Sequence, residues 1–201
     1  FIFCNFSQAV QIQISDNTSP TNTAVADPPT IHSEAAILID FKTGKVLYGK
    51  NEEEQKYPAS TTKILTAIIA LEKLNLTDKL TATYEAVMSI PAGYSNAAIQ
   101  PEETLTFQEL LDLFLIHSAN EVGYILAENI SGSIEEFANL MNQKAVEIGC
   151  TNTHFTNPSG IHDENHYSTA HDMALIAKYC MENEEFRKVV SKPSCKIAAT
   201  D

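Results

Sequence analysis

Ser60 and Lys63 are the residues whose types and spacing point most directly to chemistry. They stand three residues apart, just before a stretch, 64–74, with apolar residues at helical spacing. Positions i and i+3 of a helix share one face, so the ammonium group of Lys63 is predicted to lie just above the Ser60 hydroxyl at the helix N-terminus. A hydroxyl beside a nitrogen base is the arrangement of an activated serine nucleophile. A water-poor cleft would lower the pKa of Lys63 and let it accept the proton.

The same pair also has a simple structural interpretation. Serine is a common helix N-cap, a lysine in a first turn is usually solvated, and Ser-x-x-Lys occurs by chance in many sequences. The helix dipole disfavours a cation in the first turn, which favours a special role for Lys63. The rest of the sequence has to decide between the two interpretations.

A second group, Ser118-Ala119-Asn120, falls between two apolar stretches predicted to be helices, 110–116 and about 121–129. Such a junction can present side chains into a cleft. The Ser118 hydroxyl could relay a proton, and the Asn120 amide could hold a substrate carbonyl. Serine and asparagine are also ordinary residues of a connecting turn, so this group alone is as weak a signal as the first.

Length and composition limit the class of protein. The chain has 201 residues, enough for one domain with a core, and its net charge of −13 argues against nucleic acid and anionic membrane surfaces as partners. The cysteines show no zinc-like spacing. Cys150 and Cys180 lie in apolar helical contexts and are expected to be buried thiols, although a disulfide between two of Cys150, Cys180 and Cys195 stays open.

Three regions are expected along the chain. Residues 1–10 are interpreted as a signal-peptide remnant, which indicates export and is too short to span a membrane. Residues 11–33, rich in Ser, Thr, Asn, Asp and Pro, are interpreted as a disordered linker. Residues 34–201 are interpreted as a catalytic domain that is truncated at its C-terminus.

The expected elements of this domain make a helix-rich α+β fold. A buried strand, 35–40, is followed by a turn, 41–44, and a second strand, 45–50, and 80–83 is a short strand before a region expected to be loop through 94. Helix starts are indicated by capping residues. The expected capping positions are Thr106 with Glu109, Ser133 with Glu136, and Thr169 before a helix through Met181.

Together these segments resemble the low-molecular-mass penicillin-binding proteins, the serine D-alanyl-D-alanine carboxypeptidases. Residues 57–67 resemble the family's active-site segment, and 115–121 resemble its second motif, Ser-x-Asn. Residues 153–174 resemble a long segment that separates these carboxypeptidases from class A β-lactamases. The resemblance runs from about residue 35 to about residue 177.

The resemblance implies a β-lactamase/transpeptidase-like fold, with a helical cluster on an antiparallel sheet whose late strands lie beyond the chain end. It also implies that Ser60 attacks peptidoglycan stem peptides and removes the terminal D-alanine through an acyl-enzyme. Lys63 would take the serine proton, Ser118 would help to shuttle protons, and Asn120 would orient the substrate amide. β-Lactams would acylate Ser60, and neither a metal nor an organic cofactor is implied. The expected location is the outer face of the bacterial cytoplasmic membrane, with anchoring only through a C-terminal segment beyond this chain.

One family motif is expected beyond Asp201. The family has a Lys-Thr-Gly strand after the nucleophile, which binds the substrate carboxylate. Lys42-Thr43-Gly44 precedes the nucleophile and is interpreted as a hairpin turn instead. The cleft is therefore expected to lack one wall, and the activity is assigned to the parent protein more safely than to this fragment.

Three other interpretations remain beside this one. The first is a zinc site, because His162 and His166 stand four apart with acids between them. However, a zinc metalloprotease has Glu on a helix where this sequence has Asp163, and Pro158 and Gly160 indicate a loop. A class A-like β-lactamase needs an acid for deacylation, for which Glu164 is a candidate by vicinity alone. A non-catalytic penicillin-binding or sensory module of the cell wall is the third alternative.

Overall fold

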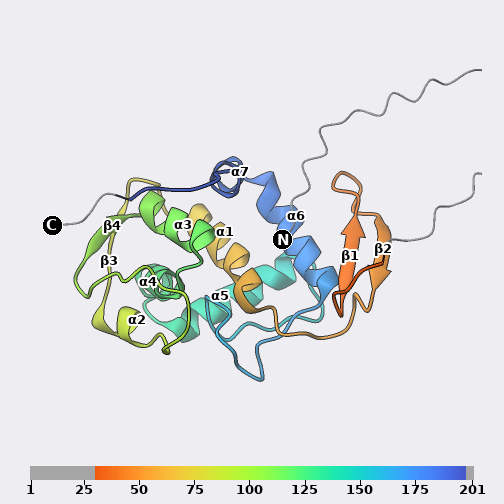
Figure 1. Cartoon of the computed structure of the whole chain (residues 1–201), viewed down its shortest axis with the longest axis horizontal. Helices are drawn as coiled ribbons and strands as arrows, with labels where there is room; N and C mark the ends of the chain where they lie inside the picture. Colours follow the sequence, from red (N-terminus) through yellow and green to blue (C-terminus); the bar gives the residue numbers. More distant parts are fainter. Residues whose placement is uncertain (1–29, 198–201) are drawn as a thin grey trace, which may run out of the picture. The chain divides into compact units, whose positions relative to one another are not determined.

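The computed structural model describes residues 30–197 of the chain (Figure 1). The expected signal-peptide remnant, and all of the expected linker up to residue 29, lie outside these residues. The predicted class is confirmed, because helices dominate and both sheets are antiparallel. In chain order the elements are β1 (Ala36–Ile39), β2 (Val46–Lys50), the 3-10 turn η1 (Ala59–Thr62), α1 (Lys63–Lys73), β3 (Lys79–Thr81), α2 (Tyr84–Met88), β4 (Thr104–Thr106), α3 (Phe107–Ile116), α4 (Asn120–Ser131), α5 (Ile134–Ile148), α6 (Ala170–Glu182) and α7 (Glu184–Val190).

The hairpin β1–β2 is closed by a turn that Asp40 organises. Its carboxylate oxygen Oδ1 accepts hydrogen bonds from the backbone N–H of Thr43 at 2.7 Å and from the Thr43 hydroxyl at 2.6 Å. Gly44 has a φ of +73°, which a residue without Cβ adopts easily. The segment Lys42-Thr43-Gly44 is therefore a hairpin turn, as predicted, and not a strand lining a cleft.

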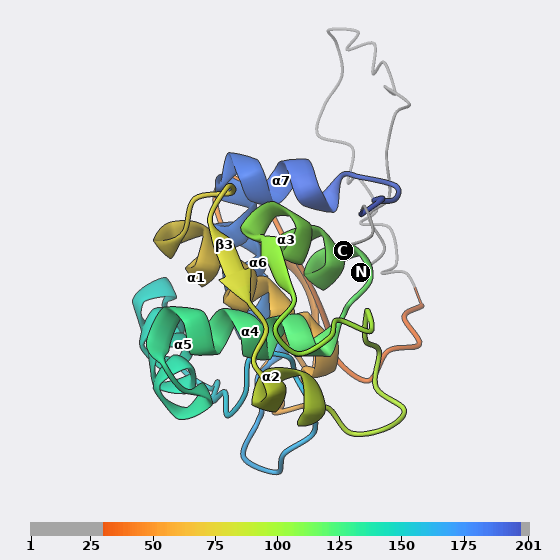
Figure 2. The ribbon, with the colours of Figure 1, turned by 90° about the vertical axis from the view of Figure 1, so that its left-hand side faces the viewer.

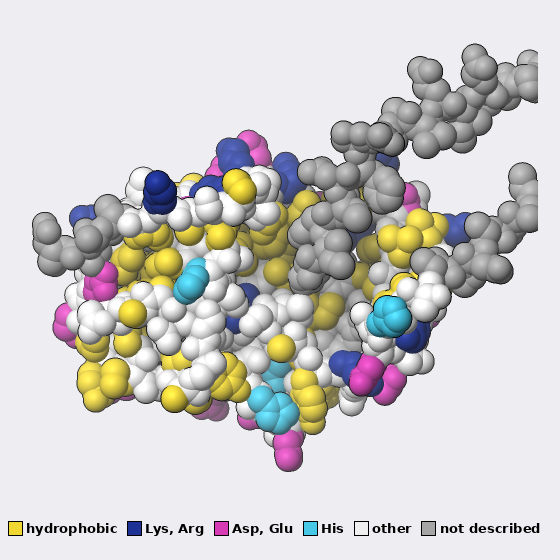
Figure 3. Space-filling view, viewed as in Figure 1, with side chains coloured by type: hydrophobic (Ala, Val, Ile, Leu, Met, Phe, Trp, Pro, Cys, Tyr) yellow, Lys and Arg dark blue, Asp and Glu magenta, His cyan; other side chains and the backbone are white. Residues whose placement is uncertain are grey.

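Strand β1 is less buried than predicted. Leu38 is 56% exposed, and Leu47 on β2 is 58% exposed. Side chains of a strand alternate between faces, and α6 packs against β1, so the side chains pointing the other way stay open. Figure 3 shows apolar side chains on the surface of the hairpin at the right of the view.

Helix α1 lies at the centre of the helical cluster (Figures 1 and 2). Helices α3, α4, α5, α6 and α7 all pack against it. Its residues from Leu65 to Ala70 are all buried, as expected of a helix that is apolar on nearly every side. The residue at its N-terminus, Lys63, therefore enters a region from which water is excluded.

The predicted helix caps are confirmed. The Thr106 hydroxyl accepts from the backbone N–H of Glu109, and the Glu109 carboxylate accepts from the backbone N–H of Thr106. The two hydrogen bonds form a complete capping box. The hydroxyls of Ser133 and Thr169 each accept from a backbone N–H three residues on. Each such cap contributes about 1 kcal/mol to stability, so the helix starts follow from local sequence.

Two short helices were not predicted. Helix α2 occupies part of the region expected to be loop, and the Thr83 hydroxyl caps it by accepting from the backbone N–H of Ala86. Helix α7 is capped by Asn183 and carries Glu184 and Glu185 in its first turn, where the helix dipole favours acids.

The ribbon β3–β4 lies against the helices α3 and α4 (Figure 2). Strand β4 runs directly into α3, because its last residue, Thr106, is the N-cap of that helix. Residues 82–103 form the long connection between the paired strands β3 and β4. In this connection the backbone carbonyl of Ser95 accepts from the backbone N–H of Asn120 at the start of α4.

The cysteines of the described part carry no disulfide. Cys150 and Cys180 are buried free thiols, as predicted, and Cys195 is a half-buried free thiol. Burial raises the pKa of Cys150 to about 12, so this thiol is inert at neutral pH. Between residues 30 and 197, none of the helices has the length and apolar character needed to cross a membrane.

Candidate active site

The predicted nucleophile and base meet where η1 passes into α1. The ammonium of Lys63 donates a hydrogen bond to the Ser60 hydroxyl oxygen at 3.1 Å. The helix was expected to begin at Ser60, but Ser60 lies in the 3-10 turn and the α-helix begins at Lys63. A 3-10 turn has three residues per turn, so residues i and i+3 eclipse one another. Ser60 is exposed, whereas Lys63 is only 2% exposed, so a reagent can reach the nucleophile while the base stays dry.

Among residues 30–197, every hydrogen-bond acceptor of Lys63 is a neutral oxygen. Besides the Ser60 hydroxyl, the amide oxygen of Asn120 and the backbone carbonyl of Ser159 each accept from it at 2.8 Å. Burial lowers the pKa of Lys63 from 10.5 to about 8, while the negative charge of Glu121 acts in the opposite direction. With that pKa roughly a tenth of the lysine is neutral at pH 7 and can accept a proton.

Asn120 holds this base in place. Its amide oxygen faces Lys63, and its amide nitrogen donates to the backbone carbonyl of Ser95 at 2.7 Å. The backbone N–H of Asn120 donates to the same carbonyl at 3.0 Å. The structure thus shows Asn120 orienting Lys63, whereas its predicted contact with a substrate amide stays a prediction.

Ser118 lies at the same junction but outside this hydrogen-bonded cluster. It is half-buried, and its hydroxyl has no hydrogen-bond partner among residues 30–197. Its φ of +62° is a left-handed conformation that costs a non-glycine residue about 1 kcal/mol. The junction between α3 and α4 thus holds Ser118 in a strained turn, and its role as a proton relay stays a prediction.

The loop 156–161 supplies a part of the site that the sequence analysis missed. The side-chain oxygen of Asn157 accepts from the backbone N–H groups of Ser159, Gly160 and Ile161 at 3.2, 2.8 and 3.1 Å. Gly160 has a φ of +83°, and a Cβ there would lie 1.9 Å from the carbonyl oxygen of Ala59. Pro158 and Gly160 indicated a loop, but nothing local indicated that this loop closes over η1 and that the Ser159 carbonyl accepts a hydrogen bond from Lys63.

Glu121 is a second residue that the sequence analysis did not single out. It is 1% exposed, and its Oε1 atom accepts from the backbone N–H of Ala97 at 2.6 Å. Its Oε2 atom has no hydrogen-bond partner among the described residues. This buried carboxylate therefore ties the start of α4 to the loop at 95–97 and places a negative charge near Lys63.

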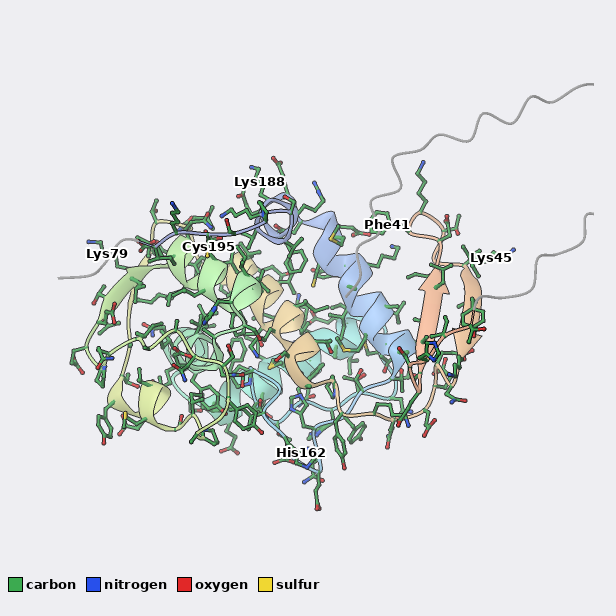
Figure 4. All side chains as sticks on the ribbon, viewed as in Figure 1. Phe41, Lys45, Lys79, His162, Lys188 and Cys195 are labelled. Carbon is green, nitrogen blue, oxygen red and sulfur yellow. The ribbon has the colours of Figure 1, made fainter. Side chains whose placement is uncertain are left out.

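The residues of the zinc interpretation do not converge. His162 lies at the outer tip of the loop (Figure 4). Its ring forms a T-shaped pair with the Tyr57 ring, with 4.6 Å between the ring centroids. His166 is 2% exposed, and both of its ring nitrogens are engaged by threonines. Within residues 30–197 no group of three or more His, Cys, Asp and Glu residues is placed to hold a metal ion. Glu164, the acid considered for a β-lactamase, is exposed on the same loop.

The described residues thus form an α+β fold in which a buried lysine, one 3-10 turn after an exposed serine, donates a hydrogen bond to that serine's hydroxyl. The D-alanyl-D-alanine carboxypeptidase family of peptidases matches residues 21–199, and the chain belongs to this family. The resemblance on which the sequence analysis relied is thereby confirmed.

Named relatives agree with this assignment. The chain is 42% identical over 161 residues to D-alanyl-D-alanine carboxypeptidase DacF of Bacillus subtilis, which covers 78% of the chain and 41% of that protein. It is 36% identical over 160 residues to DacC of Escherichia coli, covering 76% and 40%. A crystal structure of a D-alanyl-D-alanine carboxypeptidase from Mycobacterium tuberculosis superimposes with a TM-score of 0.79 at 31% identity, covering 86% of the chain and 65% of that structure. The chain thus spans about two-fifths of the length of the first two relatives.

Proposed function

We propose that this chain carries the nucleophile and base of a serine D-alanyl-D-alanine carboxypeptidase that removes the terminal D-alanine from peptidoglycan stem peptides during cell-wall maturation. The observation that carries the proposal is the buried Lys63, bonded to Ser60 and held by neutral acceptors. The names of the relatives supply the substrate class.

In the acylation step, neutral Lys63 takes the proton of the Ser60 hydroxyl as the oxygen attacks the carbonyl carbon between the two D-alanines. A bond forms between Oγ and that carbon, and the carbon–nitrogen bond breaks. The proton on Lys63 then passes to the amine of the departing D-alanine. We assign one oxyanion donor to the backbone N–H of Ser60, supported by its place near the N-terminal end of η1 and α1.

In the second step, water adds to the ester carbon, the bond between that carbon and Oγ breaks, and a proton of the water passes through Lys63 to the Ser60 oxygen. We assign to Ser118, two residues before Asn120 at the junction between α3 and α4, a share in both proton transfers. We assign to Asn120, whose amide oxygen accepts from Lys63, a second task of orienting the substrate amide. Lys42–Gly44 closes the hairpin and is therefore not assigned to the substrate carboxylate. A β-lactam is expected to acylate the same Ser60 and leave slowly.

The proposal also sets the place of action. Peptidoglycan lies outside the bacterial cytoplasmic membrane, so the enzyme meets its substrate as an exported protein at the outer face of that membrane. The apolar segment at residues 1–10 supports export. A β-lactamase is not favoured, since the relatives are carboxypeptidases and Glu164 is exposed on its loop.

The test is intact-mass analysis after incubation with a penicillin, with the adduct mapped by peptide. It is run on this chain and on the chain extended past Asp201, together with release of D-alanine from a synthetic peptide ending in D-Ala-D-Ala. We expect a stable adduct on Ser60 in the extended chain and D-alanine release by that form.

The matched control is Ser60→Ala in both forms, which removes one oxygen at an exposed position and is expected to abolish the adduct. An adduct that persists in this variant would overturn the assignment of the nucleophile. Rapid turnover of the penicillin, instead of a long-lived adduct, would favour a β-lactamase. No adduct in either form would point to a non-catalytic relative in the cell wall.

A further inference from the structure

His166 is a buried histidine that the proposed chemistry does not use. It lies at the end of the loop 157–168 and is only 2% exposed. Its Nε2 atom lies 2.8 Å from the hydroxyl oxygen of Thr62, across 104 residues of sequence. The rings of Phe155 and His166 form a T-shaped pair, with 5.3 Å between the centroids.

The hydrogen bonds determine which tautomer the ring adopts. The backbone N–H of Thr156 can only donate, and it points to Nδ1 of His166 at 3.1 Å. Nδ1 therefore carries a lone pair, and the proton of the neutral ring is on Nε2. It follows that Nε2–H donates to Thr62, whose hydroxyl oxygen accepts.

The ring stays neutral over the range in which the enzyme would work. Burial lowers the pKa of His166 to about 4, with Asp163 acting to raise it and His154 acting to lower it further. Thr62 and Phe155, which face the ring from η1 and from the neighbouring segment, carry no charge. Above about pH 5 the contact between Nε2–H and Thr62 is therefore constant.

This contact joins the two segments that hold Lys63. Thr62 is the last residue of η1 and directly precedes Lys63. Thr156 begins the loop that brings the Ser159 carbonyl to the Lys63 ammonium. The two segments also touch at Gly160, where no side chain fits against Ala59. The imidazole is thus hydrogen-bonded both to η1 and to the loop 156–161, and we refer to this pair of bonds as a clamp.

We propose that His166 is a positioning residue for acylation: its Nε2–H bond to Thr62 holds the loop 156–161 against η1, so that the Ser159 carbonyl accepts from Lys63. The inference rests on the proposed function and adds a residue to it. Without the clamp, the loop separates from η1, water reaches Lys63, and the pKa of the lysine returns toward that of an exposed lysine.

The test compares His166→Phe, which keeps an aromatic ring but no polar atom, with His166→Gln, which keeps a donor and an acceptor. His154→Phe is the matched control, since it removes an exposed histidine that bonds only a backbone carbonyl in the same region. The rate constant for acylation by a chromogenic β-lactam is measured between pH 5.5 and 10. The variants are made in whichever of the two forms of the earlier test, this chain or the extended chain, is acylated by penicillin. Thermal unfolding of each variant is recorded alongside.

We expect His166→Phe to move the midpoint of the pH–rate profile upward by at least about one unit, which is about a tenfold loss of rate at pH 7. His166→Gln should restore part of the shift, and His154→Phe should match the wild type. If His166→Phe fails to fold, Thr62→Val removes the other end of the same bond and should give the same shift.

A variant that melts earlier but keeps the wild-type midpoint would show a merely structural histidine and overturn the inference. That result leaves the proposed function intact, because Ser60 would still be acylated. Absence of acylation in the wild-type protein would instead overturn the proposed function and the inference with it.

Discussion

Two buried or half-buried lysines of this molecule, Lys63 and Lys144, have opposite environments. Lys144 on α5 donates to the carboxylates of Glu72 at 2.9 Å and Glu147 at 3.1 Å, and Tyr179 donates to the same Glu72. Burial lowers the pKa of Lys144, but the two carboxylates outweigh burial and the net pKa is raised. Lys63 is more deeply buried, its acceptors in the described part of the chain are all neutral oxygens, and its pKa falls.

The comparison separates hydrogen bonding from charge compensation. Both ammonium groups have acceptors, so neither is left unsatisfied. A carboxylate also stabilises the positive charge itself, which a hydroxyl, amide or carbonyl does much less. A lysine that must act as a base near neutral pH needs neutral acceptors. A lysine that ties two helices together needs carboxylates.

The largest effect on the rate of acylation should come from removing the Lys63 amine. Lys63→Ala deletes the proposed base and is expected to slow acylation of Ser60 by about 10²–10⁴-fold. Lys144→Ala is the matched control and should leave the rate within about twofold while losing at most about 1 kcal/mol of stability, as is typical of partly exposed ion pairs. Stopped-flow acylation and thermal unfolding measure the two effects. Equal rates in both variants would remove the distinction between the two lysines.

The pH dependence of the wild type should follow the neutral fraction of Lys63. That fraction rises with pH up to the pKa of about 8, so acylation should rise about tenfold per pH unit below 8 and level off above it. The sign follows from a base that must lose its proton before it can accept one. A profile whose midpoint lies near 10.5, the value of an exposed lysine, would contradict the dry environment of Lys63.

Replacing a neutral acceptor with a charged one should make Lys63 resemble Lys144. Asn120→Asp places a carboxylate at the atom that now lies 2.8 Å from the ammonium. The midpoint of acylation should move upward by more than about one unit, with a loss of about tenfold or more at pH 7. Asn129→Asp, the same change on the same helix at an amide that bonds backbone carbonyls, is the control. An unshifted midpoint in Asn120→Asp would count against the electrostatic account.

The smallest effect is expected from Glu121→Gln. Its charge raises the pKa of Lys63, so its removal should lower the midpoint and speed acylation at pH 7 by a few-fold. The amide oxygen of the new residue can still accept from the Ala97 N–H, which keeps the loop in place. Glu128→Gln, one acid further along α4, should leave the midpoint unchanged. A midpoint that rises in Glu121→Gln would show that its role is structural instead.

Features that depend on neighbours within three or four positions were predicted from the sequence. The pair of Ser60 and Lys63, the capping box at Thr106 and Glu109, and the hairpin turn at Asp40 are of this kind. Each rests on a side chain and a backbone or side-chain atom that local geometry brings together. The family assignment follows from the same short motifs taken jointly.

The tertiary structure alone decided what surrounds those motifs. The Ser159 carbonyl reaches Lys63 from 96 residues away, and His166 reaches Thr62 from 104. The exposure of Leu38 likewise depends on which elements pack on the hairpin. Burial and long-range contacts belong to the packed whole, so the sequence alone indicated which lysine could act as a base, while the packing around it made the site dry enough to lower its pKa.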